Sequence, residues 1–229
     1  PYIANYTITC PGDMPDGYTV LPTASATLVY SIDEHHMVSG LRGVNTKATV
    51  VGTHANHFQV LLLIEFHPAG LYPLLRIPQS ELLDFSFAFD GIDKKLDKQV
   101  CHALEASGSI EDLTGALNQI FLKRLVYVEI DSDIALAMQH LIGAHGAITV
   151  QTLSQVVYRS EKQLGRLFKQ HIGTGIKTFA RIVRINHAMR LLEGTNGSTA
   201  LTATAAGYFD QAHFIHDFQA LCGITPQTY

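Results

Sequence analysis

The stretch from Leu153 to Phe168 reads Leu-Ser-Gln-Val-Val-Tyr-Arg-Ser-Glu-Lys-Gln-Leu-Gly-Arg-Leu-Phe. Its apolar residues form two groups with the spacing of a helical face, namely Leu153, Val156 and Val157, then Leu164, Leu167 and Phe168. The segment Tyr158-Arg159-Ser160 between them has room only for a tight turn, and Ser160 is a favoured N-cap residue. The stretch therefore predicts two short helices joined by a turn, a helix-turn-helix.

The second of these helices has a polar face. Its long side chains are Lys162, Gln163, Arg166 and Lys169. Side chains of this kind reach base edges and phosphates when a helix lies in the major groove. An ordinary pair of amphipathic helices with a solvated basic face would explain the same residues, and this stretch alone does not separate the two interpretations.

The charge of the chain is unevenly distributed. The formal net charge of −4 would argue against a nucleic-acid partner if it were spread evenly. Residues 1–130 hold 8 Lys and Arg against 14 Asp and Glu, whereas residues 131–229 hold 8 against 6. Between Tyr158 and Arg190, eight basic residues face one acid, Glu161. The second half of the chain is therefore suited to contact nucleic acid.

Length and composition indicate a two-domain protein of a reducing compartment. The 229 residues, 47% of them hydrophobic, suffice for two cores. The cysteines Cys10, Cys101 and Cys222 lie far apart and show no C-x-x-C spacing. No apolar run reaches the length of a membrane span, and no signal peptide is visible. We therefore expect a cytoplasmic protein without membrane contact.

Residues 1 to about 90 have the pattern of strands and turns. Segments rich in β-branched and aromatic residues alternate with Gly, Pro, Asn and Asp, and they cover residues 2–8, 18–21, 27–32, 48–51 and 58–66. Short strands at this spacing along the chain favour an antiparallel sandwich or a small barrel. Such domains often hold a small molecule, but the ligand-binding residues stay unassigned.

From residue 96 the period changes to that of helices, over residues 96–106 and 110–128. In the second of these helices, Leu113, Leu117, Ile120 and Phe121 lie along one stripe. We expect this stripe either to cover the β-domain or to pack against its copy in a second subunit, which would make the protein a homodimer.

Residues 131–229 show the same helix-turn-helix pattern twice. A helix over residues 131–145 precedes the first helix-turn-helix, and a long helix with a broad apolar face follows it over residues 176–193. Residues 198–208 and 210–222 then give a short helix, a turn and a second helix. Asp210 is the N-cap residue of this last helix.

The repeat resembles the DNA-binding domain of the AraC-type (AraC/XylS) bacterial transcription regulators, in which a long helix joins two helix-turn-helix units. The matching residues are Leu164-x-Arg166-x-Phe168-Lys169 with Gly173, Arg184-x-x-x-Ala188-x-x-Leu191-Leu192, and Ala203-x-x-x-Gly207-Tyr208-x-Asp210-Gln211-x-His213-Phe214. They cover about residues 131–229, and the last block is the most specific. Residues 66–72 and 77–82 also resemble the N-terminal domain of a subset of these regulators, which implies a cupin-like sensory domain.

The expected fold class is α+β. It comprises an N-terminal antiparallel β sandwich or barrel, which the resemblance makes cupin-like, and a C-terminal all-α domain with two helix-turn-helix units joined by a long helix. We expect a β-rich sensory domain over residues 1–108, a helical linker or dimerisation helix over 109–130, and the DNA-binding domain over 131–229.

DNA-contacting residues are expected in both units. They are Arg159, Ser160, Lys162, Gln163, Arg166, Lys169, Lys177, Arg181, Gln211, His213 and His216. Arg166 suits a bidentate contact to guanine. The second unit has no Lys or Arg, and His216 stands where the family commonly has Arg. We therefore expect the first unit to read sequence and the second only to position the protein, with His213 either at the DNA or serving as a capping or core residue.

Twelve histidines raise the question of a metal site. His54, His57 and His67 could gather at a barrel mouth, but no H-x-H, cysteine or acid at a matching spacing accompanies them. Scattered histidines without a metal are the favoured interpretation. No Ser/His/Asp order or phosphate-binding glycine loop is present either. We therefore expect a protein that is not an enzyme and has no metal or cofactor.

Two functions remain. The first is a sequence-specific transcription regulator that binds double-stranded DNA in the bacterial cytoplasm, associated with the nucleoid when bound. Its N-terminal half would respond to a small-molecule effector or form a homodimer, and RNA polymerase would be a partner if it is an activator. The alternative is a cupin-like small-molecule- or metal-binding protein or enzyme whose helical domain no longer binds DNA.

Overall fold

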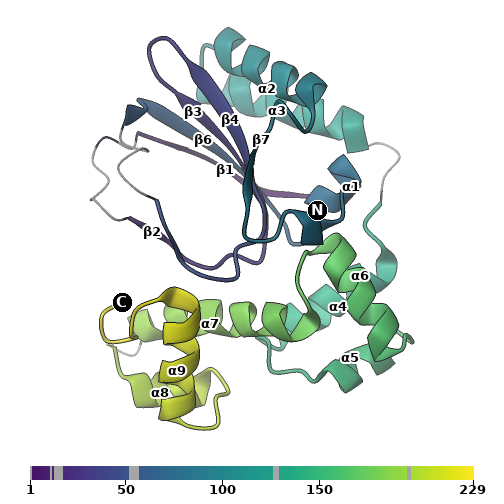
Figure 1. Cartoon of the computed structure of the whole chain (residues 1–229), viewed down its shortest axis with the longest axis vertical. Coiled ribbons are helices and arrows are strands. Elements are labelled where there is room, and N and C mark those ends of the chain that lie inside the picture. Colours follow the sequence, from purple (N-terminus) through teal and green to yellow (C-terminus); the bar gives the residue numbers. More distant parts are fainter. Residues whose placement is uncertain (1, 11, 13–17, 52–56, 126–128, 195–196) are drawn as a thin grey trace.

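The computed structural model describes residues 2–10, 12, 18–51, 57–125, 129–194 and 197–229. Figure 1 shows a sheet-rich N-terminal part, with two helices on one side of the sheet, above a C-terminal part built of helices alone. This arrangement confirms the α+β fold class. Within the described ranges, no helix has both the length and the apolar content needed to cross a bilayer.

The described residues of the N-terminal part form two antiparallel sheets. The larger has the order β1 (Ile3–Thr9), β6 (Val60–Phe66), β3 (Thr27–Ile32), β4 (Met37–Arg42) and β7 (Ser86–Ala88), and the smaller pairs β2 (Thr19–Val20) with β5 (Thr49–Val50). Alternate residues of the central strands face the core, since Leu28 and Tyr30 of β3 and Leu62 and Ile64 of β6 have no exposed surface. The sequence predicted β1, β2, β3, β5 and β6 but missed β4 and β7.

Two helices, α2 (Lys94–Ala106) and α3 (Ile110–Leu125), cover one face of the large sheet (Figure 1). The α3 stripe packs there: Leu117 is 1% exposed, and the ring of Phe121 lies edge-on to Phe66 of β6, with centroids 6.2 Å apart. The stripe therefore mainly covers the sheet, which needs an apolar cover and was one of the two expected alternatives, and a role of this helix in a homodimer stays a prediction. Ile120 is only partly buried and lies beside the core.

The C-terminal part has two cores joined by one helix. Its helices are α4 (Ser132–Gly143), α5 (Val150–Val156), α6 (Glu161–His171), α7 (Ile176–Gly194), α8 (Thr199–Ala205) and α9 (Gln211–Cys222). The start of α7 packs with α4, α5 and α6 through Ile176 and Phe179, whereas its end packs with α8 and α9 through Ala188 and Leu192. The long helix therefore sets the distance between the two units.

The two parts of the chain contact each other closely. The N-terminal part contributes α1 (Leu71–Leu75) and the short 3-10 helix η3 (Gln79–Glu81), which lie against the end of α6. The rings of Tyr72 and His171 have centroids 4.3 Å apart, and the Ala48 N–H donates to the Leu221 carbonyl oxygen at 2.8 Å. Burial lowers the pKa of His171, with a smaller lowering from Arg76 and an opposing effect of Asp131. The boundaries at residues 108 and 130 remain predictions.

Candidate nucleic-acid interface

The first helix-turn-helix unit consists of α5, the turn to Ser160 and α6. Leu164 and Phe168 of α6 are fully buried, and the Phe168 ring lies edge-on to Phe179 of α7 at 5.9 Å. The opposite face of α6 is exposed, and it carries Lys162, Gln163, Arg166 and Lys169. A basic, solvent-exposed face on a helix fixed by its core is what a recognition helix requires.

A capping box begins α6. The Ser160 hydroxyl oxygen accepts from the Gln163 backbone N–H at 3.2 Å, as the N-cap prediction requires. In return, Gln163 Oε1 accepts from the Ser160 N–H and from the Ser160 hydroxyl, both at 3.0 Å. Both residues were predicted to contact DNA, and both side chains are engaged in the start of their own helix.

Arg159 lies in the turn before this helix. Its Nε donates to Asp133 Oδ2 of α4 at 2.5 Å, and this partner raises the pKa of the guanidinium. The side chain is still half exposed. Arg159 therefore ties the turn to α4, and its predicted phosphate contact would have to be made from this position.

The second unit repeats the geometry of the first with different chemistry. Asp210 is the N-cap of α9, as predicted, and its Oδ1 accepts from the His213 N–H at 2.7 Å. The exposed face of α9 carries Gln211, His213, His216 and Gln219. Gln211 Nε2 donates to Thr199 Oγ1 of α8 at 2.5 Å, and the His213 ring packs edge-on to Tyr208. His216 and Gln219 are thus the residues of this face for which no side-chain partner is found among the described residues.

Asp217 is a buried carboxylate on the other face of α9. It is 5% exposed, accepts from Arg181 Nε at 2.7 Å and from Arg181 Nη2, and accepts from the Tyr208 hydroxyl at 3.0 Å. Burial, and after it the charge of Asp217, raises the pKa of Tyr208. Arg181, predicted to contact DNA, therefore also joins α7 to α9, and Asp217 points into the domain rather than toward phosphate.

Arg184, one turn further along α7, has a structural role. Its Nη2 donates to the Gly146 carbonyl oxygen at 2.7 Å, and its guanidinium lies 5.4 Å from the centre of the Tyr208 ring. It thus contacts both units. Within the described part of the chain, the predicted contact residues Lys162, Arg166, Lys169 and Lys177 are exposed cations without an ion pair.

Two aromatic residues next to the recognition helices were missed by the sequence analysis. Tyr158 is 95% exposed with a left-handed φ of 54°, and Phe209 is 93% exposed. Each lies within two residues of the N-cap that begins α6 or α9. A large aromatic side chain in a turn, outside any apolar period, is the signal that could have identified them.

A shallow hollow of about 380 Å³ lies along the basic face of the first unit. Lys162, Arg166 and Lys169 of α6 line it together with Glu161, and Gly175 closes it at the start of α7. With three cations and one acid around it, this hollow is basic. Its position on the exposed side of α6 suits a phosphate of the DNA backbone.

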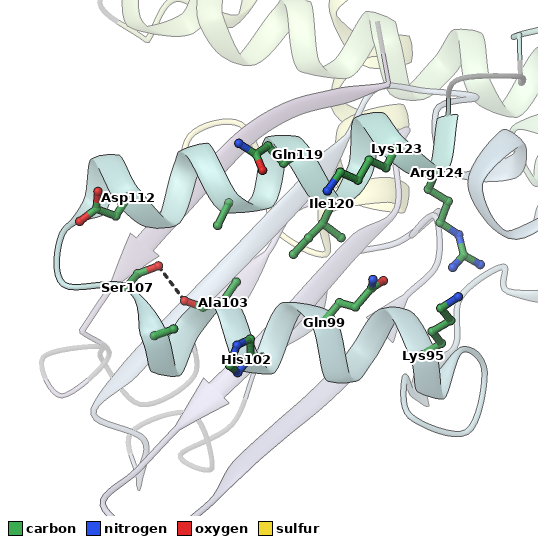
Figure 2. Close-up of a pocket in the computed structure, with 12 residues that line it drawn as sticks. Lys95, Gln99, His102, Ala103, Ser107, Asp112, Gln119, Ile120, Lys123 and Arg124 are labelled. Atoms are coloured by element: carbon green, nitrogen blue, oxygen red, sulfur yellow. Dashed lines mark hydrogen bonds between the residues drawn. The ribbon is translucent and has the colours of Figure 1, made fainter.

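A second surface feature is a groove of about 670 Å³ between α2 and α3. Figure 2 shows Lys95 and Arg124 extending toward one end of the groove, with Lys123 over its middle and Asp112 at the other end. Arg124 is ion-paired with Asp93, the N-cap residue of α2. The groove stays open between the helices because the side chains of Ala103, Ala106 and Ala116 are small.

The histidines form no evident metal site in the described ranges, where no group of three or more His, Cys, Asp or Glu could hold a metal ion. His54 lies outside the described residues, so the predicted possibility of His54, His57 and His67 at a barrel mouth is not addressed by the geometry. Cys10, Cys101 and Cys222 are free cysteines.

Comparisons with known proteins bear on the C-terminal part. Residues 153–229 match the family model of a helix-turn-helix domain. The chain is 40% identical over 67 residues to the HTH-type transcriptional regulator GlxA of Rhizobium meliloti (strain 1021). This alignment covers 29% of this chain and 21% of that protein. It is 26% identical over 143 residues to the arabinose operon regulatory protein of Salmonella typhimurium, covering 57% and 50% of the two chains.

One further relative and one solved structure are also similar to this chain. The HTH-type transcriptional activator RhaR of Yersinia pseudotuberculosis is 36% identical over 76 residues, covering 33% of this chain and 25% of that protein. The crystal structure of ToxT from Vibrio cholerae O395 aligns over 98% of this chain and 96% of that chain, with a TM-score of 0.48 and 13% identity. The chain spans half the length of these curated relatives or less. The predicted helix-turn-helix domain is confirmed.

Proposed function

We propose that this chain, whose residues 153–229 match the model of a helix-turn-helix domain, is an AraC-type, sequence-specific transcription regulator that binds double-stranded DNA. The observation that carries the proposal is the pair of exposed recognition helices, α6 and α9, held on the single helix α7. A gel shift on the DNA upstream of neighbouring genes tests it. Absence of any specific shift would favour the alternative, a cupin-like small-molecule- or metal-binding protein or enzyme.

Arg166 is the residue that we expect to read a base. It lies in the middle of the exposed α6 face, has no ion pair within the described residues, and its fork matches guanine O6 and N7. Arg166→Ala should weaken specific binding by about 1–3 kcal/mol and relax the preference at one base pair. Fluorescence anisotropy with point-substituted duplexes measures both effects. Arg190→Ala, which removes the same charge from an exposed site at the end of α7, is the control, and an equal loss for both variants would contradict the assignment.

The second unit should contribute mainly to positioning, because its exposed α9 face has no permanent cation. His216→Ala should cost less than Arg166→Ala, whereas His216→Arg should strengthen binding and steepen the salt dependence by about one unit. Titrations of both variants at several salt concentrations measure this. A His216→Ala variant as weak as Arg166→Ala would mean that the two units share the reading of sequence.

The N-terminal part is the proposed control domain, through a small-molecule effector, a homodimer or both. Leu113, Leu117 and Phe121 of α3 are buried within the chain, so the face of this helix that is open to a second copy is the one along the α2–α3 groove, which the partly buried Ile120 lines. RNA polymerase is a further partner if the regulator is an activator. Such a protein would work in the bacterial cytoplasm, on the nucleoid.

Filling the groove should separate a dimer. Ala106 is an exposed groove residue at the end of α2, so Ala106→Arg adds bulk and charge without entering the core. The mass from light scattering should fall from that of a dimer to that of a monomer. Ala135→Arg, at an exposed site on α4, is the control. A monomeric native protein, or an Ala106→Arg variant that stays dimeric, would rule out this interface.

A further inference from the structure

The end of α6 packs against the N-terminal part of the chain. His171 is the last residue of this helix, and its ring lies against the Tyr72 ring of α1, with centroids 4.3 Å apart. Gln170 Nε2 donates to the Tyr72 hydroxyl oxygen. Directly after the helix, Gly173 lets η3 come close, because an added Cβ would lie 2.8 Å from the Gln79 carbonyl oxygen. The helix that carries the basic face is therefore held at its end by α1 and η3.

His171 is a buried histidine with one unsatisfied ring nitrogen. The residue is 7% exposed, and its Nδ1 has no hydrogen-bond partner among the described residues. A neutral imidazole carries a proton on one nitrogen only, whereas an imidazolium carries a proton on both. A proton on Nδ1 would thus create a buried, charged donor without an acceptor, which costs more than a neutral unsatisfied group. The closed contact therefore favours the neutral ring.

The charges around His171 do not offset this cost. Asp131, the N-cap residue of α4, attracts the imidazolium, but its Oδ1 already accepts from two backbone N–H groups, and no ion pair joins it to His171 within the described ranges. Arg76, which follows α1, repels the imidazolium, and Glu81, the acid of η3, is exposed. Burial is the main effect and lowers the pKa of His171, the charge of Asp131 opposes it, and Arg76 adds to it.

We propose that proton uptake by His171 opens this contact and releases the end of α6 from the N-terminal part. The neutral ring packs against Tyr72, whereas the imidazolium gains its solvation only when α1 moves aside. Since Gln170 is the neighbour of His171 and bonds the same tyrosine, its hydrogen bond is lost in the same step. The contact would thus act as an acid-sensitive switch between the two parts of the chain.

The direction of the pH dependence follows from the burial of the ring. In the open chain His171 is in water, where the ordinary pKa of histidine is about 6.5, while the closed contact lowers the pKa. The closed contact is therefore at full strength above about pH 6.5 and weakens as the pH falls below this value. Between the two pKa values, the ratio of open to closed chains should rise up to about tenfold for each pH unit, because opening takes up one proton.

The consequence for regulation rests on the proposed function. The exposed face of α6 carries Lys162, Arg166 and Lys169, so one helix joins the acid-sensitive contact to the proposed DNA contact. A regulator built in this way would change the restraint on its first helix-turn-helix unit in the pH range in which histidine titrates.

The test is an NMR titration of the full chain from about pH 7.5 to about pH 5, without DNA. The imidazole signals of His171 give its pKa, which should lie below about 6.5. The NOE between the rings of Tyr72 and His171 should disappear, and the amide shifts of α1 should change, with the same midpoint. His171→Phe keeps a ring that cannot take up a proton, so its NOE to Tyr72 should persist at about pH 5.

A change of the nearby charge should move this midpoint. Arg76→Gln should shift it to higher pH, because Arg76 disfavours the imidazolium. Lys95→Gln removes the same charge from an exposed site on α2 and is the control, so it should leave the midpoint unchanged.

Three results would overturn the proposal. They are a ring NOE that persists after His171 has become protonated, α1 amide shifts that keep the same midpoint in His171→Phe, and an Arg76→Gln midpoint no higher than that of Lys95→Gln. The first result needs only the native protein, so the proposal stays testable even if phenylalanine does not fit at this position. The titration contains no DNA, so its failure is separate from that of the proposed function.

Discussion

Replacement of Asp217 by alanine is expected to destabilise the second helix-turn-helix unit by about 2–4 kcal/mol. The carboxylate is almost fully buried and accepts from Arg181 of α7 and from the Tyr208 hydroxyl before α9. Without it the Tyr208 hydroxyl loses its acceptor in the interior, whereas Arg181, 44% exposed, can still turn to water. That exposure keeps the expected loss below the cost of a fully buried pair.

Hydrogen exchange of the α8 and α9 amides measures this effect locally. Their opening free energy should fall by the stated amount while the amides of β3 and β6 keep theirs, since the two regions belong to separate cores. Asp217→Asn keeps the shape and one acceptor, so its loss should be smaller. Asp210→Ala, which removes only the N-cap of α9, should cost about 1 kcal/mol. If Asp217→Ala cost no more than Asp210→Ala, the carboxylate would not be the main link between α7 and α9.

Replacement of Gly146 by alanine is expected to destabilise the first unit by about 2–5 kcal/mol. Gly146 has a φ of +77°, and an added Cβ would lie 2.2 Å from the Ala180 carbonyl oxygen of α7. The left-handed conformation accounts for about 1–2 kcal/mol of the cost, and forcing the turn away from α7 accounts for the rest. The bond from Arg184 to the Gly146 carbonyl oxygen would also be strained.

Gly207→Ala provides the matched control. Its φ of +74° is nearly the same, but the nearest atom to an added Cβ is 3.8 Å away, so only the conformational cost applies. Thermal unfolding, and hydrogen exchange of the amides of α4 to α6, should therefore show that Gly146→Ala destabilises the first unit much more than Gly207→Ala destabilises the second. Equal losses of stability would mean that α7 moves to make room for the added methyl group. Gly165→Ala, at an open position inside α6, should instead stabilise that helix by about 0.5–1 kcal/mol.

Much of the C-terminal part could be predicted because its elements are governed by local rules. The N-caps Ser160 and Asp210 and the apolar periods of α6, α7 and α9 are short-range patterns. The link between Arg181 and Asp217 could not be predicted, since it joins residues 36 apart through a tertiary contact. Arg181 therefore entered the sequence analysis as a DNA contact alone.

Two strands of the large sheet could not be predicted from local patterns. β4 contains Gly40 and lacks regular alternation, and β7 consists of three exposed residues, so neither carries a strand pattern. They are strands because β3 and then β4 offer them a partner edge. The α3 stripe indicated a buried face, but periodicity does not say what covers that face.

The capping box of α6 limits which base Gln163 can recognise. A glutamine that pairs with adenine uses both ends of its amide, accepting from N6 and donating to N7. Here Oε1 is occupied by the Ser160 N–H and hydroxyl, and a backbone N–H can only donate, so the orientation of the amide is fixed. Gln163 can then present only its NH₂ group. If α6 enters the major groove with its cap intact, Gln163 can only donate to an acceptor such as N7 or O6 of guanine or N7 of adenine, so selection of binding sites from random duplexes should show no preference for adenine over guanine there.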